Sequence, residues 1–320
     1  MSSSVAVSRA DLTAGVLWAL AAGMFWGGAF VSPLVLPGYS ALEITAGRFT
    51  GSGLFSLVML VPALLSSRGL RLLRPSLWLT AFCLAMVGNF IYFAAMAGGV
   101  QRANAAIVTL IIGMLPIAIP TVARLRDGTF SWRATLVPSL MILAGLLAVH
   151  YAAHSRDASD GAMDLRYASG IALAFVALVS WLIFALANDQ ALARNPDIPA
   201  AVWSSIQGVA MLPVALPLLA VTLMAGATHG GDSGRAPMST FIAVSMALGI
   251  ATSWMAIWCW NRASQLLPPA MTGQLLVFET VASLTYVYLW LGMWPPLLVV
   301  TGAALLLGGV LLGIARLRRD

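Results

Sequence analysis

Ten apolar runs of about 20 residues each, separated by short polar turns, constrain this chain more than any other feature of its sequence. Each run is long enough to cross a bilayer as an α-helix, and none shows the alternating pattern of a membrane β-barrel. Charged residues make up only 9% of the chain, against about 25% in soluble domains. We therefore predict an all-α membrane protein with ten transmembrane helices and no sizeable soluble domain.

Glycine, proline and arginine mark the turns between the apolar runs. The first run has no convincing cleavage site at its end, so we interpret it as a retained first helix. The predicted spans are residues 12–33, 41–65, 77–98, 103–122, 132–150, 167–187, 200–225, 240–260, 270–291 and 296–315.

All 17 basic residues are arginines, and most of them lie in the short loops. An N-terminus in the cytoplasm puts twelve of them on the inner side and leaves Arg102, Arg156, Arg166 and Arg235 outside. This bias predicts cytoplasmic N- and C-termini and an even number of spans, in a multi-pass protein of the cell inner (plasma) membrane. It also explains the basic charge without a nucleic-acid partner, so the lipid bilayer is the expected surrounding.

The sequence also resembles itself. A shift of 155 residues aligns Trp26 with Trp181, and glycines in the later spans match under a shift of 164. We therefore predict two five-helix repeats, residues 1–152 and 153–320. Because five is odd, the second repeat would enter the membrane from the opposite side, which gives an inverted repeat around a central cavity.

One predicted span, residues 270–291, carries the carboxylate of Glu279 near its middle. Ionisable groups at this depth seldom face lipid, so Glu279 is predicted to line a cavity, where it binds a substrate ammonium or exchanges a proton. The alternative is a buried acid that only fixes helix packing. Arg48 is the other charge well inside a span, and it either pairs with an acid or a substrate carboxylate, or snorkels to the outer surface.

Three uncharged polar residues are further candidates for substrate binding. Asn89 and Tyr92 lie three residues apart and therefore share one face of their helix. Gln274 lies in the same span as Glu279. Intramembrane amides also hydrogen-bond neighbouring helices, so helix packing remains the alternative explanation for Asn89.

Aromatic residues within spans complete the predicted substrate site. Trp26 and Trp181 are the pair that the repeat aligns, Trp254 and Trp258 share a helix face, and Phe278 precedes Glu279. Their rings could stack on an aromatic or flat cationic substrate, or could simply pack against one another.

The sequence lacks the motifs of the common energy-coupling and metal chemistries. It contains no GxxxxGK[ST] phosphate loop and no HExxH, and Cys83 and Cys259 have no metal-ligand spacing around them. The three histidines, His150, His154 and His229, lie at or beyond span ends. We predict no cofactor, no metal and no catalytic residue, so the chain is not expected to be an enzyme.

Three segments carry a resemblance to a known family: GVLWALAAGMFWGGAF, NFIYFAAMAGGVQRANAAIVTLIIGMLP and TSWMAIWCWNRAS. With five plus five helices, they resemble the drug/metabolite transporter superfamily and in particular its EamA-type domains. Within that superfamily, they look like the aromatic amino acid exporters of the YddG type. The resemblance covers essentially the whole chain.

The resemblance implies a central cavity between the two halves, with helices five and ten at the periphery. The family's Glu-Pro signature falls on Leu115-Pro116 and on Glu279-Thr280, so each half keeps one member of the pair. The Trp-Asn pair of the exporters falls on Trp260 and Asn261, and the tryptophan of helix six falls on Trp181. Asn261 thereby joins the predicted substrate-binding residues.

These observations predict a secondary transporter that exports small amphipathic metabolites, above all aromatic or hydrophobic amino acids, by alternating access. A broad-specificity exporter of drugs or cationic compounds, of the methyl viologen type, is the alternative. A membrane-embedded enzyme would show a cluster of His, Asp or Glu near one interface, and this sequence has only isolated ones. Proton coupling, transport direction and oligomeric state are left open by the sequence.

Overall fold

The computed structural model describes residues 9–31, 35–66, 69–103, 105–154, 165–229 and 234–317. Within these ranges the protein is helical, without strands, and ten helices are long and apolar enough to cross a membrane. The prediction of ten spans is confirmed. The cytoplasmic placement of the termini stays a prediction, and four of the arginines counted for it, Arg68, Arg156, Arg318 and Arg319, lie outside the described residues.

The first five spans, with the short connecting helix α4, comprise ten helical segments in the described ranges. Ser40 caps the second span: its Oγ accepts a hydrogen bond from the N–H of Glu43 at 3.2 Å, and the Glu43 carboxylate accepts one from the N–H of Ser40 at 2.7 Å. The segments are α1 (Arg9–Gly27) with the 3₁₀ turn η1 (Gly28–Val31); α3 (Ala41–Leu64); α5 (Pro75–Ala85), η2 (Met86–Ile91) and α6 (Tyr92–Arg102); α7 (Ala105–Ile112) and α8 (Leu115–Arg126); and α9 (Trp132–His154), with the short α4 (Gly69–Leu72) before α5.

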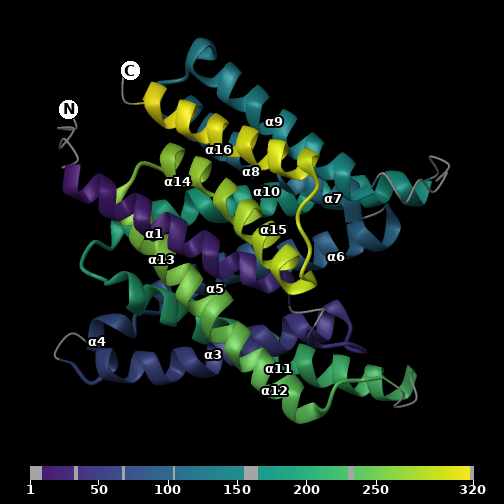
Figure 1. The fold of residues 1–320 in the computed structure, drawn as a ribbon. Coiled ribbons are helices and arrows are strands. Elements are labelled where there is room, and N and C mark those ends of the chain that lie inside the picture. The colour runs from purple at the N-terminus through teal and green to yellow at the C-terminus, as the bar shows by residue number, and fades with distance from the viewer. Residues whose placement is uncertain are drawn as a thin grey trace.

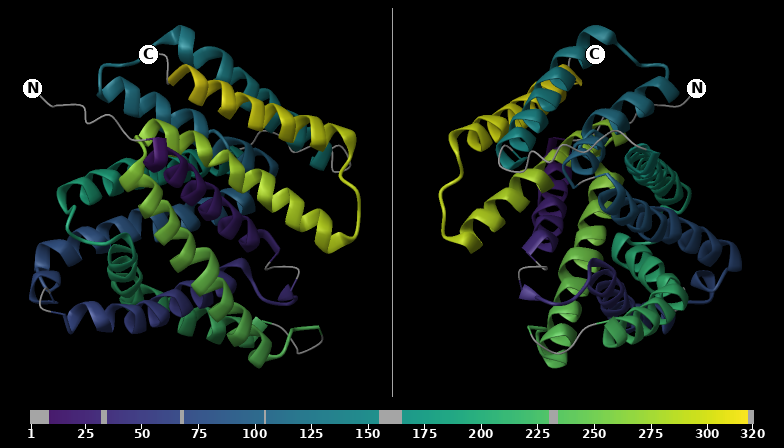
Figure 2. Two further views of the ribbon diagram at one scale, coloured as in Figure 1. Left: turned by 60° about the vertical axis from the view of Figure 1, so that its left-hand side comes forward. Right: turned by 90° about the vertical axis from the view of Figure 1, so that its right-hand side faces the viewer.

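The last five spans follow a similar order. Figure 1 and Figure 2 show the start of α1 and the end of α16 at the same end of the bundle, as an even number of spans requires. The segments are α10 (Leu165–Arg194); α11 (Ala200–His229); α12 (Met238–Leu248), η3 (Gly249–Met255) and α13 (Ala256–Leu266); α14 (Pro269–Leu275) and α15 (Val277–Leu291); and α16 (Leu297–Leu317).

Spans three and eight share an irregularity that the sequence did not predict. In both, a π-helical segment, η2 or η3, separates two α-helices. Each segment contains a glycine against which another span packs: a Cβ on Gly88 would lie 2.5 Å from the ring of Phe184, and one on Gly249 would collide with the backbone of Ser52. π-Helical turns are frequent at functional sites.

Spans four and nine are also interrupted at matching places. The fourth span breaks between α7 and α8 at Gly113 and Met114, just before Pro116, which has no N–H to continue the helix. The ninth breaks at Leu276, between α14 and α15. Both breaks lie within predicted spans, residues 103–122 and 270–291, and each span remains a single candidate membrane crossing.

Pairs of packed spans recur with the first five and the last five spans exchanged. The first span packs on the eighth (α1 on α13), as the sixth packs on the third (α10 on α6). The third contacts the seventh (α5 with α11), as the eighth contacts the second (α12 with α3). Corresponding spans meet directly in the pairs α3 with α11, α8 with α14 and α9 with α16. The last pair lies at the edge of the bundle in Figure 1.

An ion pair joins the start of α3 to the segment before α12. The guanidinium of Arg235 donates to the buried carboxylate of Glu43 at 2.5 Å and lies over the ring of Tyr39 at 4.1 Å. Tyr39 in turn stacks on Phe241, with ring centroids 4.4 Å apart. Burial opposes the charge of Arg235, but its hydrogen bonds to Tyr39 and Glu43 outweigh that effect and raise the pKa of Arg235.

We expect Arg235→Gln to lower the free energy of unfolding by about 2 kcal/mol, because it leaves the carboxylate of Glu43 buried without its counter-charge. Thermal unfolding of the purified protein in detergent measures this loss. Arg262→Gln is the matched control, since Arg262 is exposed and bonds only Gln265. Equal stability of the two variants would show that the ion pair does not hold these segments together.

Candidate substrate-binding site

Arg48 lies in the first half of α3 with its side chain in the protein interior. The residue is only 8% exposed, and its guanidinium lies over the rings of Phe93 at 4.6 Å and Phe49 at 4.8 Å. Its Nε atom is buried and has no hydrogen-bond partner among the residues that the structure describes. The alternative of snorkelling to the outer surface is therefore wrong, and a buried cation keeps an unused donor.

Glu279 lies in the first turn of α15, directly after the break at Leu276. The positive end of the helix dipole stabilises a carboxylate at that position. The first span passes against this turn, since a Cβ on Gly23 would lie 3.0 Å from the backbone nitrogen of Glu279. Glu279 is half-buried, and no hydrogen bond or salt bridge among the described residues uses its carboxylate.

Three spans bring Arg48, Tyr92 and Glu279 into one electrostatic group, which we name the charged cluster. Arg48 and Glu279 lie close enough to interact electrostatically, and the phenol of Tyr92 lies within the same range of both. Arg48 and Glu279 nevertheless form no direct salt bridge in the described part of the chain. A guanidinium and a carboxyl group are thus held near each other within the membrane spans without a direct contact between them.

A small cavity with a mixed polar and apolar lining lies next to the charged cluster. Its volume is about 30 Å³, and Phe49, whose ring contacts Arg48, forms part of its wall. The two π-helical segments supply Asn89 from η2 and Ser253 and Trp254 from η3. The hydroxyl of Ser253 is buried and has no hydrogen-bond partner in the described part of the chain. The structure therefore brings Asn89 and Trp254 together around a space large enough for a water-sized polar group.

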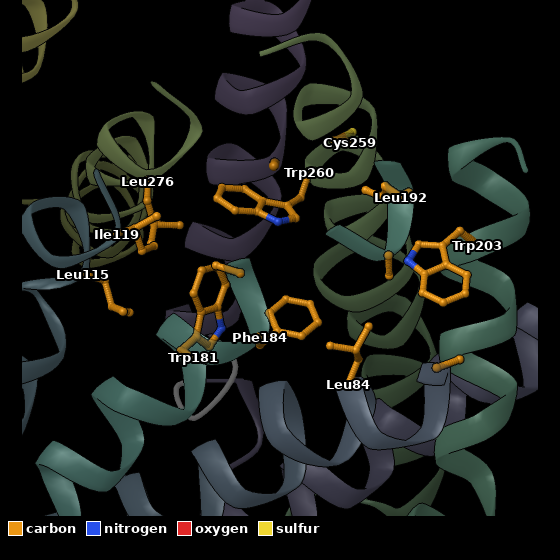
Figure 3. Packing of buried hydrophobic residues seen from close by; sticks show 14 of the residues in the cluster. Leu84, Leu115, Ile119, Trp181, Phe184, Leu192, Trp203, Cys259, Trp260 and Leu276 are labelled. Atoms are coloured by element: carbon orange, nitrogen blue, oxygen red, sulfur yellow. The ribbon is translucent and has the colours of Figure 1, made fainter. Parts of the chain in front are cut away.

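Trp26, Trp181 and Trp260 form an aromatic triad in the middle of the bundle. Their ring centroids are 5.7 Å apart for Trp26 and Trp181, 5.6 Å for Trp26 and Trp260, and 5.4 Å for Trp181 and Trp260. Figure 3 shows Trp181 and Trp260 beside Phe184 in the packed core. Trp181 is 9% exposed and Trp260 2%, whereas Trp26 is half-buried. Only Trp26 therefore offers substantial ring surface to a ligand.

Trp254 and Trp258 contact each other, with ring centroids 5.5 Å apart. Trp258 is half-buried and packs on Trp18 of the first span at 5.3 Å. Trp254 is buried, and its Nε1 donates to the hydroxyl of Ser205 at 2.9 Å. The ring of Trp254 is thus fixed by a neighbouring span, which suits a rigid cavity wall.

Asn261 lies within a hydrogen-bond network rather than on a cavity wall. It is 0% exposed; its Oδ1 accepts from Asn188 at 2.8 Å, and its Nδ2 donates to Ser204 at 2.8 Å. Asn188 also accepts from Trp203 and from Gln207, both at 2.9 Å. The network joins spans six, seven and eight.

We expect Asn188→Leu to destabilise the protein by about 1 to 3 kcal/mol, since Trp203, Gln207 and Asn261 each lose a partner in the core. Thermal unfolding in detergent measures the effect. Asn195→Leu is the control, because Asn195 lies just after α10 and its side-chain amide donates to the carbonyl of Ala191, outside the network. An unfolding temperature unchanged by Asn188→Leu would mean that the network contributes little to stability.

The side chains of Gln274 and Phe278 pack against different spans. Gln274 is buried against the tenth span, where a Cβ on Gly313 would collide with its amide, and its Oε1 has no partner. Phe278 is half-buried and packs against the first span at Gly23. The structure therefore separates Gln274 from the charged cluster, while Phe278 and Glu279 both adjoin the first span.

Several site residues were not predicted from the sequence. Asn188 and Gln207 are amides inside apolar spans, and that signal alone could have identified them. Phe93 and Ser253 gave no such signal, because only the fold puts a ring under Arg48 and a hydroxyl into the cavity. The described residues contain no group of three or more His, Cys, Asp or Glu that could hold a metal ion.

Comparisons with known proteins agree with this architecture. Residues 13–150 match the model of the EamA-like transporter family. The chain is 40% identical over 315 residues to the inner membrane protein YtfF of Escherichia coli (strain K12), covering 95% of each. A solved crystal structure matches with a TM-score of 0.68 at 20% identity, over 98% of this chain and all of that one. This last likeness shows the fold alone.

None of these matches supports the aromatic-exporter branch in particular. They do agree on a multi-pass protein of the inner membrane, with a transporter rather than an enzyme as the family's type. The identity over nearly the full length of both chains and the matching family model establish that the chain belongs to the EamA-like transporter family, within the drug/metabolite transporter superfamily.

Proposed function

We propose that the protein is a secondary transporter that carries aromatic or other hydrophobic amino acids outward, and that the charged cluster binds their backbone. The observation that carries the proposal is the presence, within the membrane spans, of the buried guanidinium of Arg48 and the carboxyl of Glu279, which form no salt bridge with each other among the described residues. An amino acid brings one carboxylate and one ammonium, and each is costly to bury unpaired. Arg48 offers donors to the carboxylate, and Glu279 offers acceptors to the ammonium.

The rings around the charged cluster suit an aromatic or other apolar side chain. Tyr92 and Trp26 are half-buried, and the rings of Tyr92 and Phe93 meet at 5.0 Å. A cationic drug would also bind to Glu279, but the positive charge of Arg48 nearby would repel it. This repulsion favours the amino acid over the alternative of a broad-specificity exporter of cationic compounds.

Alternating access by two inverted five-helix repeats, residues 1–152 and 153–320, is part of the same proposal. The exchange of packing partners between spans supports it, because a two-fold axis relating the halves produces that pattern. The matching π-helical segments of spans three and eight, and the matching breaks of spans four and nine, support it as well. These irregular turns are the places where each half would bend.

Counterflow in reconstituted vesicles tests the proposal. Labelled phenylalanine and tryptophan should exchange into vesicles loaded with the unlabelled amino acid, and threonine should exchange more slowly because it lacks an apolar ring. Absence of flux for all three would overturn the proposal that the protein transports amino acids. Flux of methyl viologen alone would favour the cationic-compound exporter.

A further inference from the structure

A long groove separates the last two spans. Its volume is about 450 Å³, and it runs between α15 and α16 to the turn at residues 292–295. The lining comes from one face of each helix: Val281, Thr285 and Tyr288 on α15, and Val299 and Ala303 on α16. The two helices diverge here because each packs chiefly on another partner, α15 on α1 and α16 on α9.

The groove is on the face of α15 opposite Glu279. At 100° per residue, Val281, Thr285 and Tyr288 fall about halfway around the helix from Glu279. The Glu279 side of α15 meets the first span at Gly23 and Gly27, where an added Cβ would lie 3.0 Å and 2.8 Å from the α15 backbone. A single helix therefore separates the charged cluster from the groove.

The groove does not suit water. Its lining is mostly apolar, and the hydroxyl of Thr285 already donates to the carbonyl of Val281 at 2.8 Å. A trapped water needs two to four polar partners. Both helices are membrane spans, so hydrocarbon is the medium that reaches this depth.

We propose that the groove between α15 and α16 holds one acyl chain of a membrane phospholipid. The groove ends at the turn that carries Trp294, which is 94% exposed, and exposed tryptophans mark the level of the lipid headgroups. A chain that hangs from a headgroup at that level enters along the groove, parallel to both helices. In this position it supports the back of α15 and keeps the helix against the first span.

Photo-crosslinking in nanodiscs tests the proposal directly. The probe is a phosphatidylethanolamine with a diazirine in the middle of one acyl chain, and mass spectrometry of the digested protein locates the adducts. We expect adducts to concentrate on residues 281–303 of the wild type, several-fold above the exposed lipid-facing positions of α9. Ala303→Phe fills the groove and should remove this excess. Ala304→Phe makes the same change one residue on, at an exposed position outside the groove, and should retain it.

Thr285→Phe fills the groove from the other helix, so the test survives if Ala303→Phe does not fold. Adducts no more frequent in the groove than on α9 would overturn the proposal. So would an excess that both filling variants leave unchanged, or crosslinks between two copies of the protein at these residues. The result does not depend on the transported substrate, because only lipid contact is measured.

Discussion

We expect Glu279→Gln to lower the rate of tryptophan counterflow by at least about tenfold. Glutamine keeps the size of the side chain but removes the charge that pairs with the substrate ammonium, and it cannot exchange a proton. The remaining uptake should also lose pH dependence that comes from this carboxylate. Counterflow into vesicles across a series of pH values measures both effects.

Two controls separate this role from a general need for acids in the membrane. Glu279→Asp keeps the charge and should retain part of the activity. Asp189→Asn removes a half-buried acid near the end of α10 and should leave tryptophan counterflow close to the wild-type rate. Full activity of Glu279→Gln with an unchanged pH profile would mean that Glu279 only fixes helix packing.

The second large effect is expected from Arg48→Met, which should also reduce tryptophan counterflow by at least about tenfold. Methionine fills a similar volume between Phe49 and Phe93 but offers the substrate carboxylate no donor. Because the variant removes a buried charge with an unused donor, the substrate-free protein should be no less stable. Loss of transport together with retained thermal stability distinguishes binding from folding.

Arg48→Lys is the variant to compare with Arg48→Met. A lysine keeps the positive charge but lacks the planar guanidinium that stacks on the rings, so an intermediate rate is expected. If Arg48→Met instead unfolds at a markedly lower temperature and Arg48→Lys transports normally, Arg48 acts through the packing of α3 rather than through the substrate.

The number of spans was predictable from the sequence because the thickness of the bilayer sets the length of an apolar run that can cross it. Glu279 and Arg48 could also be identified from the sequence, because a charged side chain within an apolar run costs free energy at most positions in the bilayer. The direction of the Arg48 side chain was not predictable. It depends on Phe49 and Phe93, which the fold brings together from spans two and three.

The sequence could not show which candidate residues contact a substrate when their neighbours come from several different spans. Asn261 and Gln274 are both intramembrane amides, yet one lies in a hydrogen-bond network and the other faces the tenth span at Gly313. The π-helical segments escaped prediction because one extra residue in a helical turn leaves the apolar pattern almost unchanged. Asn89 and Trp254 lie within these segments and line the same cavity.

The most direct test of the substrate site is a binding comparison with three ligands: tryptophan, tryptamine, which has only the ammonium, and indole-3-propionate, which has only the carboxylate. Glu279→Gln should weaken binding of tryptophan and tryptamine about tenfold and leave indole-3-propionate unchanged. Arg48→Met should weaken tryptophan and indole-3-propionate and leave tryptamine unchanged. If both variants instead weaken all three ligands equally, or neither weakens any, the charged cluster is not where the substrate backbone binds.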